Sequence, residues 1–439
     1  MIGKLVVTIR LCIFFLMSLL IPSLFSAPVS ADALQQTDTS PTFGRPIFSL
    51  EFPDINNISF PPDYSYDSPT FEAKLSAKGS YVVAVQDYFD PQKYSTAAYL
   101  GSKLHVWVVQ NVPSDIKTDL VSIFPDVTRD IGFGSGWGKT KIAISPDERY
   151  VAVARRMDIA LYSLPELTLQ MTVAVAPVSD TERSQTALEW SLDNRYVAMV
   201  RNQQLAVWDI QANQKHTYPL DYAQISYVGG GFLTATRDGW IVDEFISPAS
   251  TFFACDQQVA HCHSYLFENG DYVRSNGTGS ILLVPSDLNT SPIHTSVWKL
   301  QDDKTYQRSE NPVDLPANFI PVRLSDSGKY AFFRADNLSQ IRRTSDWSVV
   351  QTLEPSDRLL WFPDEHYLLV TSPFNGVSLF QVGQETPYET LNYFSHLSST
   401  QINRLTLDAS RWSMDSDGKV ALYSAGWLNL IIPLRASSN

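Results

Sequence analysis

Short apolar runs separated by polar turns recur along most of the chain. The clearest unit spans residues 140–164, where the apolar run 142–144 is followed by the turn Ser145-Pro146-Asp147-Glu148. Two further runs, 150–154 and 159–162, complete the unit. Each run is too short for a stable helix and is rich in β-forming residues, so the pattern predicts strands joined by tight turns.

Variants of this unit continue to the C-terminal end. The first residue of the second strand marks each copy: Tyr81, Tyr150, Tyr196, Tyr330 and Tyr367 in the clear copies, and Phe232, Tyr272 and Val420 in the weaker ones. The mean spacing is about 48 residues, near the period of a four-stranded propeller blade. Many runs are apolar on both sides of the pleat, so both faces of each sheet need cover. A β-sandwich with chance turns is the competing arrangement.

The Ser-Pro-Asp turn at 145–147 and the strand ending in Trp208-Asp209 carry a resemblance to a known family. Over residues 70–434 the chain resembles the WD40-type (WD40/YVTN-like) β-propeller repeat superfamily. The Gly-His dipeptide of regular repeats is missing, so the resemblance is to a degenerate member. It implies an all-β fold, a single β-propeller of four-stranded blades. The eight copies favour eight blades, and seven remain possible because the runs 280–284 and 296–300 compete for one place.

The two ends of the repeat region predict how the ring closes. The last repeat offers strands at 419–423 and 428–434 but lacks an outer strand, whereas residues 47–52 form an isolated strand before the first repeat. Closed propellers remove their exposed edge by completing one blade from both ends. We therefore expect the N-terminal strand to complete the last blade.

The N-terminal segment has the pattern of an export signal. Lys4 and Arg10 precede the apolar core 11–21, and small residues at Ala31 and Ala33 offer cleavage sites. The expected organisation is a signal peptide at 1–33, a tether with the ring-closing strand at 34–69, and the propeller at 70–439. The protein is expected to be secreted or extracytoplasmic, and an uncleaved segment 11–25 would anchor it to the membrane.

The charge balance narrows the choice of partner. The 439 residues carry a net charge of −13 with a pI near 5.0. Nucleic acids and anionic membranes attract concentrated positive charge, so neither is an expected partner. We expect a monomer that binds a protein or a cell-envelope component, with membrane contact only through a retained signal segment.

Cysteine usage agrees with export. Cys255 and Cys262 are the two cysteines beyond the signal segment, and an even pair in an oxidising compartment predicts one disulfide. The residues between them are expected to link the outer strand of one blade, near 251–253, to the inner strand of the next. A metal site with His261 and His263 is the alternative, but alternate residues of a strand point to opposite faces and would scatter the ligands. No metal and no cofactor is expected.

Two aromatic-rich stretches are the candidate binding loops. Residues 87–103 are expected to interrupt the first blade between its second and third strands, and residues 126–139 to join it to the second blade. The resemblance implies that both emerge on one face of the ring. Binding residues concentrate on loops of a rigid scaffold, although such aromatics can also simply pack a loop down. The candidate binding residues are Tyr88, Phe89, Tyr94, Tyr99, Phe133 and Trp137.

No motif indicates a reaction. The Gly-rich stretch 134–140 lacks the glycine spacing and the helix of a phosphate-binding loop, and 415–418 lacks the closing glutamate of a calcium loop. No catalytic residue is assigned. We favour an exported, non-catalytic scaffold for protein interaction or ligand binding. The alternative is a propeller hydrolase or lyase acting on a carbohydrate or lactone, with catalytic groups gathered around the central channel.

Overall fold

A computed structural model describes most of the repeat region. The described residues are 41–44, 47–52, 71–89, 99–111, 120–132, 140–175, 186–201, 204–220, 232–246, 249–268, 273–285, 294–309, 313–314, 319–335, 337–356, 358–372, 376–392, 411–425 and 428–436. All of them belong to one compact unit, Pro41–Ala436.

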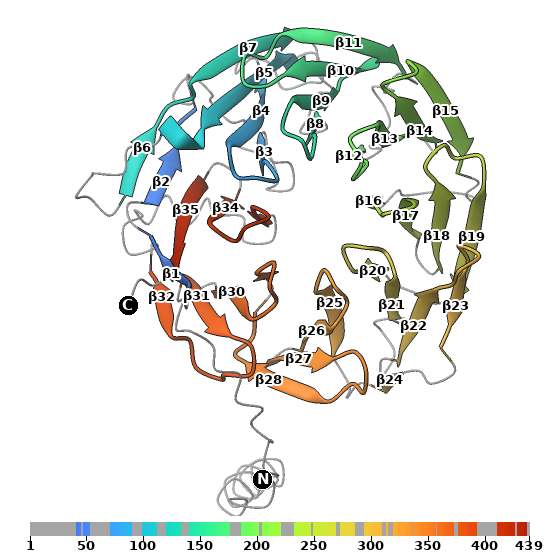
Figure 1. Ribbon diagram of the computed structural model, residues 1–439, viewed down its shortest axis with the longest axis vertical. Helices are drawn as coiled ribbons and strands as arrows, with labels where there is room; N and C mark the ends of the chain where they lie inside the picture. The colour runs from blue at the N-terminus through green and yellow to red at the C-terminus, as the bar shows by residue number, and fades with distance from the viewer. Residues whose placement is uncertain are drawn as a thin grey trace, which may run out of the picture. The chain divides into compact units, whose positions relative to one another are not determined.

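Eight sheets, antiparallel apart from one strand pair in the eighth, stand around a common centre, so the chain is an eight-bladed β-propeller (Figure 1). The first four blades are β3 (Phe71–Leu75), β4 (Tyr81–Phe89), β5 (Tyr99–Val108) and β7 (Val127–Gly132); β8 (Lys141–Ile144), β9 (Tyr150–Ala154), β10 (Asp158–Ser163) and β11 (Leu169–Ala174); β12 (Ala187–Trp190), β13 (Tyr196–Arg201), β14 (Gln204–Asp209) and β15 (Gln214–Pro219); and β16 (Phe232–Ala235), β17 (Gly239–Ile246), β18 (Ala249–Asp256) and β19 (Cys262–Glu268).

The remaining blades complete the ring. They are β20 (Arg274–Ser275), β21 (Ile281–Pro285), β22 (His294–Leu300) and β23 (Tyr306–Arg308) with β24 (Val313–Asp314); β25 (Ile320–Leu324), β26 (Tyr330–Arg334), β27 (Ser339–Arg343) and β28 (Val349–Leu353); β29 (Arg358–Trp361), β30 (Tyr367–Ser372), β31 (Gly376–Gln381) and β32 (Glu389–Leu391); and β33 (Arg411–Met414), β34 (Val420–Ala425) and β35 (Leu428–Ala436) with β1 (Pro41–Phe43), β2 (Ile47–Leu50) and β6 (Leu120–Ile123).

The described residues are almost free of helix. One 3₁₀ turn, Val109–Asn111, is their single helical element. Accordingly, none of them belongs to a helix with the length and apolarity that crossing a bilayer requires.

Burial on both faces of the strands holds the blades together. In β9 alternate residues serve opposite neighbours: Val151 and Val153 pack toward the first blade, whereas Ala152 and Ala154 pack toward the third. None of these four side chains is accessible to solvent. The apolar runs of the sequence are therefore strands sandwiched between sheets, as the absence of alternation predicts.

The recurring Ser-x-Asp turn connects the first and second strands of a blade. A buried side-chain oxygen at its first position accepts the backbone N–H five residues later, which fixes the hairpin. The acceptors are Ser76, Ser145, Ser191, Asn276, Ser325 and Asp415, at 2.8–3.1 Å from the donor nitrogens. Six of the eight blades thus have a side-chain hydrogen-bond acceptor at this position, and it is not always serine.

Successive turns also bind one another around the ring. The residue three places after the first position of the turn has positive φ, and where it is not glycine its side chain caps the turn of the preceding blade. Glu148 accepts the Lys78 N–H at 2.6 Å, and Asn194 accepts the Asp147 N–H at 2.7 Å. Glu365 does the same for Ser327, also at 2.7 Å. The face that bears these turns is therefore a linked annulus, called the turn face below.

The eighth blade joins the two ends of the described chain, as predicted. Its strands β33, β34 and β35 continue into β2, with Phe48 opposite Ile431 and Ser49 opposite Leu430. The short strand β1 pairs with the far end of β35. An addition that the sequence did not indicate is β6, which leaves the first blade and pairs in parallel with β2.

Three sequence-based assignments near the middle of the chain were wrong. Phe232 begins a first strand, and the second strand of the fourth blade begins at Gly239, because the Ser-x-Asp signal is replaced there by Thr236. The runs 280–284 and 296–300 do not compete, since they form β21 and β22 of the same blade. Residues 251–253 belong to the third strand β18, not to an outer strand. Tyr272 lies outside the described residues.

Candidate functional site

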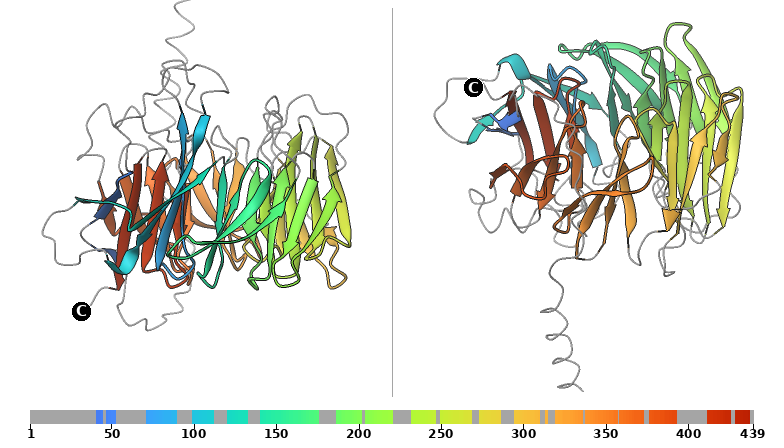
Figure 2. Two further views of the ribbon diagram at one scale, coloured as in Figure 1. Left: turned by 90° about the horizontal axis from the view of Figure 1, so that it is seen from above. Right: turned by 60° about the horizontal axis from the view of Figure 1, so that its bottom comes forward.

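The ends of the two candidate loops meet at one edge of the first blade. Strand β4 runs to Phe89 and β5 begins at Tyr99, while β7 ends at Gly132, beside Ser102 of β5. Since strands alternate in direction, the connection from β4 to β5 and the connection from β7 to β8 leave the same face of the ring. We call this the loop face; it is opposite the turn face, and Figure 2 shows the strands running between the two.

Three buried polar side chains fasten these ends together. The Asp87 carboxylate accepts hydrogen bonds from the Ser102 hydroxyl and, at 2.9 Å, from the Thr140 hydroxyl. Asp87, Ser102 and Thr140 are at most 2% exposed. A buried carboxylate requires such donors, because desolvating an unsatisfied one is costly. This cluster, called the Asp87 cluster, therefore ties β4, β5 and the start of the second blade into one rigid base.

Two glycines allow the close approach at this base. Gly101 adopts φ +145° and Gly132 adopts φ +70°, both in the region that favours glycine. A Cβ on Gly101 would also lie 3.1 Å from the Gly132 carbonyl oxygen. The backbone geometry and the Asp87 cluster together define where the two loops start and end.

Both predicted loops are shorter in the structure than the sequence suggested. Residues 87–103 are not one long loop, since strand pairing continues to the Phe89–Tyr99 pair. Residues 127–132 form the outer strand β7 rather than a connection. That strand has one solvated face, so its sequence is mostly polar and resembles a loop.

The predicted binding residues fall at or beyond these strand ends. Tyr88, Phe89 and Tyr99 are in β4 and β5, but their side chains are outside the described part of the structure. Tyr94, Phe133 and Trp137 lie outside the described residues altogether. The sequence-based prediction did not include Asp87, Ser102 or Thr140. The available indication was that small polar residues lie at the ends of both predicted loops.

Cys255 and Cys262 form the predicted disulfide, but in a different place from that predicted. They face each other across the hairpin of β18 and β19, the third and outer strands of one blade, with Cα atoms 4.1 Å apart. The bond removes both thiolates from any metal site, and within the described ranges no group of three or more His, Cys, Asp or Glu residues could hold a metal ion.

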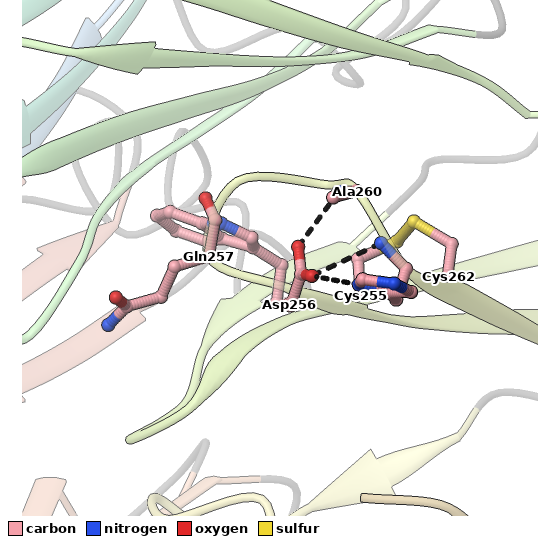
Figure 3. The surroundings of a disulfide bond; sticks show 7 residues. Cys255, Asp256, Gln257, Ala260 and Cys262 are labelled. Atoms are coloured by element: carbon pink, nitrogen blue, oxygen red, sulfur yellow. Dashed lines mark hydrogen bonds and ion pairs between the residues drawn. A yellow bond between two sulfur atoms is a disulfide. The ribbon is translucent and has the colours of Figure 1, made fainter.

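The turn that the disulfide closes is held by further bonds (Figure 3). The Asp256 carboxylate accepts the Ala260 N–H at 2.9 Å and the His261 N–H at 3.1 Å. The Trp240 indole N–H donates to the Gln257 carbonyl at 3.2 Å, and Gln258 reaches the Tyr196 hydroxyl of the third blade at 3.3 Å. The disulfide therefore belongs to a structural turn on the turn face.

A cleft of about 360 Å³ lies beside this turn, between the fourth and fifth blades. Its floor includes Trp240 and Tyr306, and an ion pair between Lys304 and Asp238 joins the two blades at 2.6 Å. Burial raises the pKa of Tyr306 well above its ordinary range, so the phenol stays protonated. The Tyr306 hydroxyl donates to the Gly279 carbonyl, which makes it a packing element rather than an acid or base.

Comparisons with known proteins identify no family for this chain. No model of a protein family matches the sequence, and no curated protein matches it. Among many similar solved structures is a chain of the Mitotic Checkpoint Complex crystal structure, with 14% identity and a TM-score of 0.46 over 68% of this chain and 86% of that chain. Another is Hsv2 of Kluyveromyces lactis, with 15% identity and a TM-score of 0.44 over 65% and 90%. Neither likeness bears on function.

Proposed function

We propose that the protein is an exported, non-catalytic β-propeller that binds another protein through the loop face of its first blade. The observation that carries the proposal is the Asp87 cluster. It buries a carboxylate and two hydroxyls in order to hold the ends of two connections side by side. Loops anchored on a rigid base in this way are the usual place for recognition on a repeat scaffold.

The sequences of the two connections suit protein recognition. Residues 90–98 contain Tyr94, and residues 133–139 contain Phe133 and Trp137 among glycines. Tyr and Trp carry a large share of binding energy in protein interfaces. A protein partner is therefore favoured, and a carbohydrate component of the cell envelope is the competing ligand for the same aromatic residues.

The centre of the ring supports binding rather than catalysis. The inner strands carry two glutamates, and each is paired with a lysine: Glu72 with Lys141 at 2.7 Å, and Glu189 with Lys74 at 3.6 Å. A hydrolase or lyase for carbohydrates or lactones needs a carboxylate free to exchange a proton.

Export is the second part of the proposal. It rests on the signal pattern of residues 1–33 and is consistent with the disulfide, because such bonds persist in oxidising compartments. The intact mass of the protein recovered from its own host tests it. A mass corresponding to cleavage near Ala31 or Ala33 supports export with removal of the signal, whereas a full-length mass in the cytosol contradicts it.

The binding proposal is tested with a variant that alters the loop face alone. We expect the double substitution Tyr94→Ala and Trp137→Ala to weaken partner capture about tenfold or more, as loss of two interface anchors does. Partners are cross-linked in the intact host and quantified by mass spectrometry for both the parent protein and the variant.

Phe124→Ala is the matched control. Phe124 is 69% exposed and precedes β7 at the turn-face end of the same blade. The control is expected to capture the same partner as the parent protein, with all three proteins melting at the same temperature. Equal capture by the double variant and the parent would place binding elsewhere.

A further inference from the structure

The inner strands have a charge balance opposite to that of the whole chain. Overall, 46 acidic residues outnumber 33 basic ones. The eight strands nearest the centre of the ring are β3, β8, β12, β16, β20, β25, β29 and β33, and their charged residues are Glu72, Lys74, Lys141, Glu189, Arg274, Arg323, Arg358 and Arg411. Basic residues therefore predominate at the one place where all blades converge.

Ion pairs show which inner-strand positions face the centre. Lys74 and Glu189 each lie two residues before the acceptor of their turn, in the first and third blades, yet their side chains meet at 3.6 Å. The second blade stands between them and has the small Ala143 at the same position. Side chains at this position therefore extend over the neighbouring inner strand at the centre of the ring.

The charges are arranged unequally around the ring. The first three blades hold both glutamates and both lysines, in two ion pairs, and the fourth has no charged residue in its inner strand β16. Each of the four remaining blades places one arginine in its inner strand. We call Arg274, Arg323 and Arg358, of the fifth, sixth and seventh blades, the arginine arc.

Two members of the arc occupy the centre-facing position itself. Arg274 precedes the acceptor Asn276 by two residues, and Arg323 precedes Ser325 by two, so both match Lys74 and Glu189 of the other half. Strands β20 and β25 are neighbours in the ring, so these two guanidinium groups belong to adjacent blades at the same level.

Arg323 has the surroundings of a ligand-binding cation. The Arg323 side chain is exposed to solvent, and desolvation by the surrounding protein lowers its pKa, an effect that Asp326 partly opposes. One guanidinium nitrogen donates to the Leu359 carbonyl of the next blade at 3.4 Å, a long bond to a neutral acceptor. The side chain is thus anchored to the next blade and still open to a ligand from solvent.

We propose that the arginine arc binds a small multivalent oxyanion at the centre of the ring. Arginine presents a planar fork of donors that matches phosphate and carboxylate groups in pairs, and every cation of the arc is arginine rather than lysine. Like charges on neighbouring inner strands repel one another, and a bound anion removes that cost. The acidic exterior repels large polyanions, so the ligand is a small molecule with several phosphate or carboxylate groups.

The test uses the full-length protein, with pyrophosphate for the phosphate class and citrate for the carboxylate class. We expect calorimetry to detect binding of at least one of them, weakened by added salt, together with a higher melting temperature in its presence. Arg323→Gln is expected to weaken binding about tenfold, whereas Arg323→Lys keeps the charge and recovers part of it. Which anion binds distinguishes the two ligand classes.

Arg343→Gln is the matched control, because Arg343 ends strand β27 of the same blade, is half exposed and lies 3.9 Å from Asp346. It is expected to bind the anion as the parent protein does. The inference is overturned if neither anion binds, or if Arg323→Gln and Arg343→Gln bind with the affinity of the parent. Should Arg323→Gln fold poorly, Arg274→Gln replaces it with the same expected loss of affinity.

Discussion

Glu148 of the second blade accepts the backbone N–H of Lys78 of the first blade at 2.6 Å, although Glu148 itself is held at φ +64°. A left-handed conformation is unfavourable for a residue with a long side chain. The bond across the blade boundary offsets that cost. The first blade has Gly79 at the equivalent position, where positive φ is readily adopted but no side chain is present to link two blades.

Removing that link should weaken the annulus of turns. Glu148→Ala keeps the strained φ and leaves the Lys78 N–H without its acceptor, so we expect a loss of about 1–3 kcal/mol in the free energy of unfolding. Chemical denaturation measures it. Glu148→Gln retains an acceptor and should lose much less, and Glu148→Gly should fall between the two because it relieves the backbone. An equal loss in all three variants would contradict this account.

Asp415 should make stability depend on pH. Burial is the largest influence on this carboxyl and raises its pKa, although the Lys419 and Val420 N–H groups oppose the effect. A raised pKa in the folded state means that the contribution to stability is full below the ordinary aspartate range and is lost as pH rises through the folded value. Asp415→Asn is therefore expected to raise the melting temperature at pH 7.

The fifth blade supplies the precedent for this substitution. Asn276 fills the equivalent position there and accepts the corresponding N–H at 3.0 Å. The gain from Asp415→Asn should shrink toward zero near pH 3, where the aspartate is protonated as well. A gain that is independent of pH, or a loss at pH 7, would show that burial of the charge is not the controlling factor.

Ring closure by β2 should be essential to stability. Phe48 is 3% exposed, pairs with Ile431 and packs in a cluster with Leu50, Phe52 and Trp107. Phe48→Ala is expected to cost about 3–5 kcal/mol, as for other large buried aromatics. Ser49→Ala at the adjacent, partly buried position is the control and should cost far less. Urea unfolding compares them, and equal small losses would refute closure by this strand.

The Asp87 cluster should be both structural and functional. Asp87→Ala leaves two buried hydroxyls without their acceptor and is expected to cost about 1–3 kcal/mol. We also expect it to weaken capture of the partner, because the ends of both connections lose their common anchor. Asp87→Asn keeps one acceptor oxygen and should retain more of both properties. Full partner capture by a measurably destabilised Asp87→Ala protein would separate the cluster from recognition.

The disulfide should contribute moderately, because it closes a short loop. Cys255 and Cys262 are separated by 7 positions, for which the chain-entropy relation gives about 2–3 kcal/mol. The double substitution to serine should lower the free energy of unfolding by that amount, measured by chemical denaturation, and added reductant should then have no further effect. A reductant effect that persists in the double variant would mean that the bond is not the reducible element.

The sequence was sufficient for the architecture because the architecture is local. Ser145 and Tyr150 lie five residues apart, so the hydrogen bond that fixes their hairpin leaves a short, recognisable pattern. The fourth blade was misread because Thr236 bonds to Gly239 only three residues away, which shortens the pattern. The disulfide pair was predicted from the number of cysteines. Its predicted place in the blade was wrong, because it depended on the wrong strand assignment in the fourth blade.

Contacts between distant segments were less predictable. Asp87 meets Thr140, and Lys74 meets Glu189 across an intervening blade. No local rule relates such residues, because their proximity depends on the number of blades and on the register of every strand between them. Strand β6 was hidden for the same reason: its partner is an N-terminal strand rather than its own blade.

The pairing of β2 with β35 also constrains how the chain folds. Strands β1 and β2 are synthesised first among the blade strands, yet their antiparallel partner β35 is the last. Until these strands pair, the outer edge of β35 is uncovered, and such an edge can recruit another chain. Pairing between residues so far apart in sequence is slow. A high protein concentration during refolding is therefore a condition to which this ring is vulnerable.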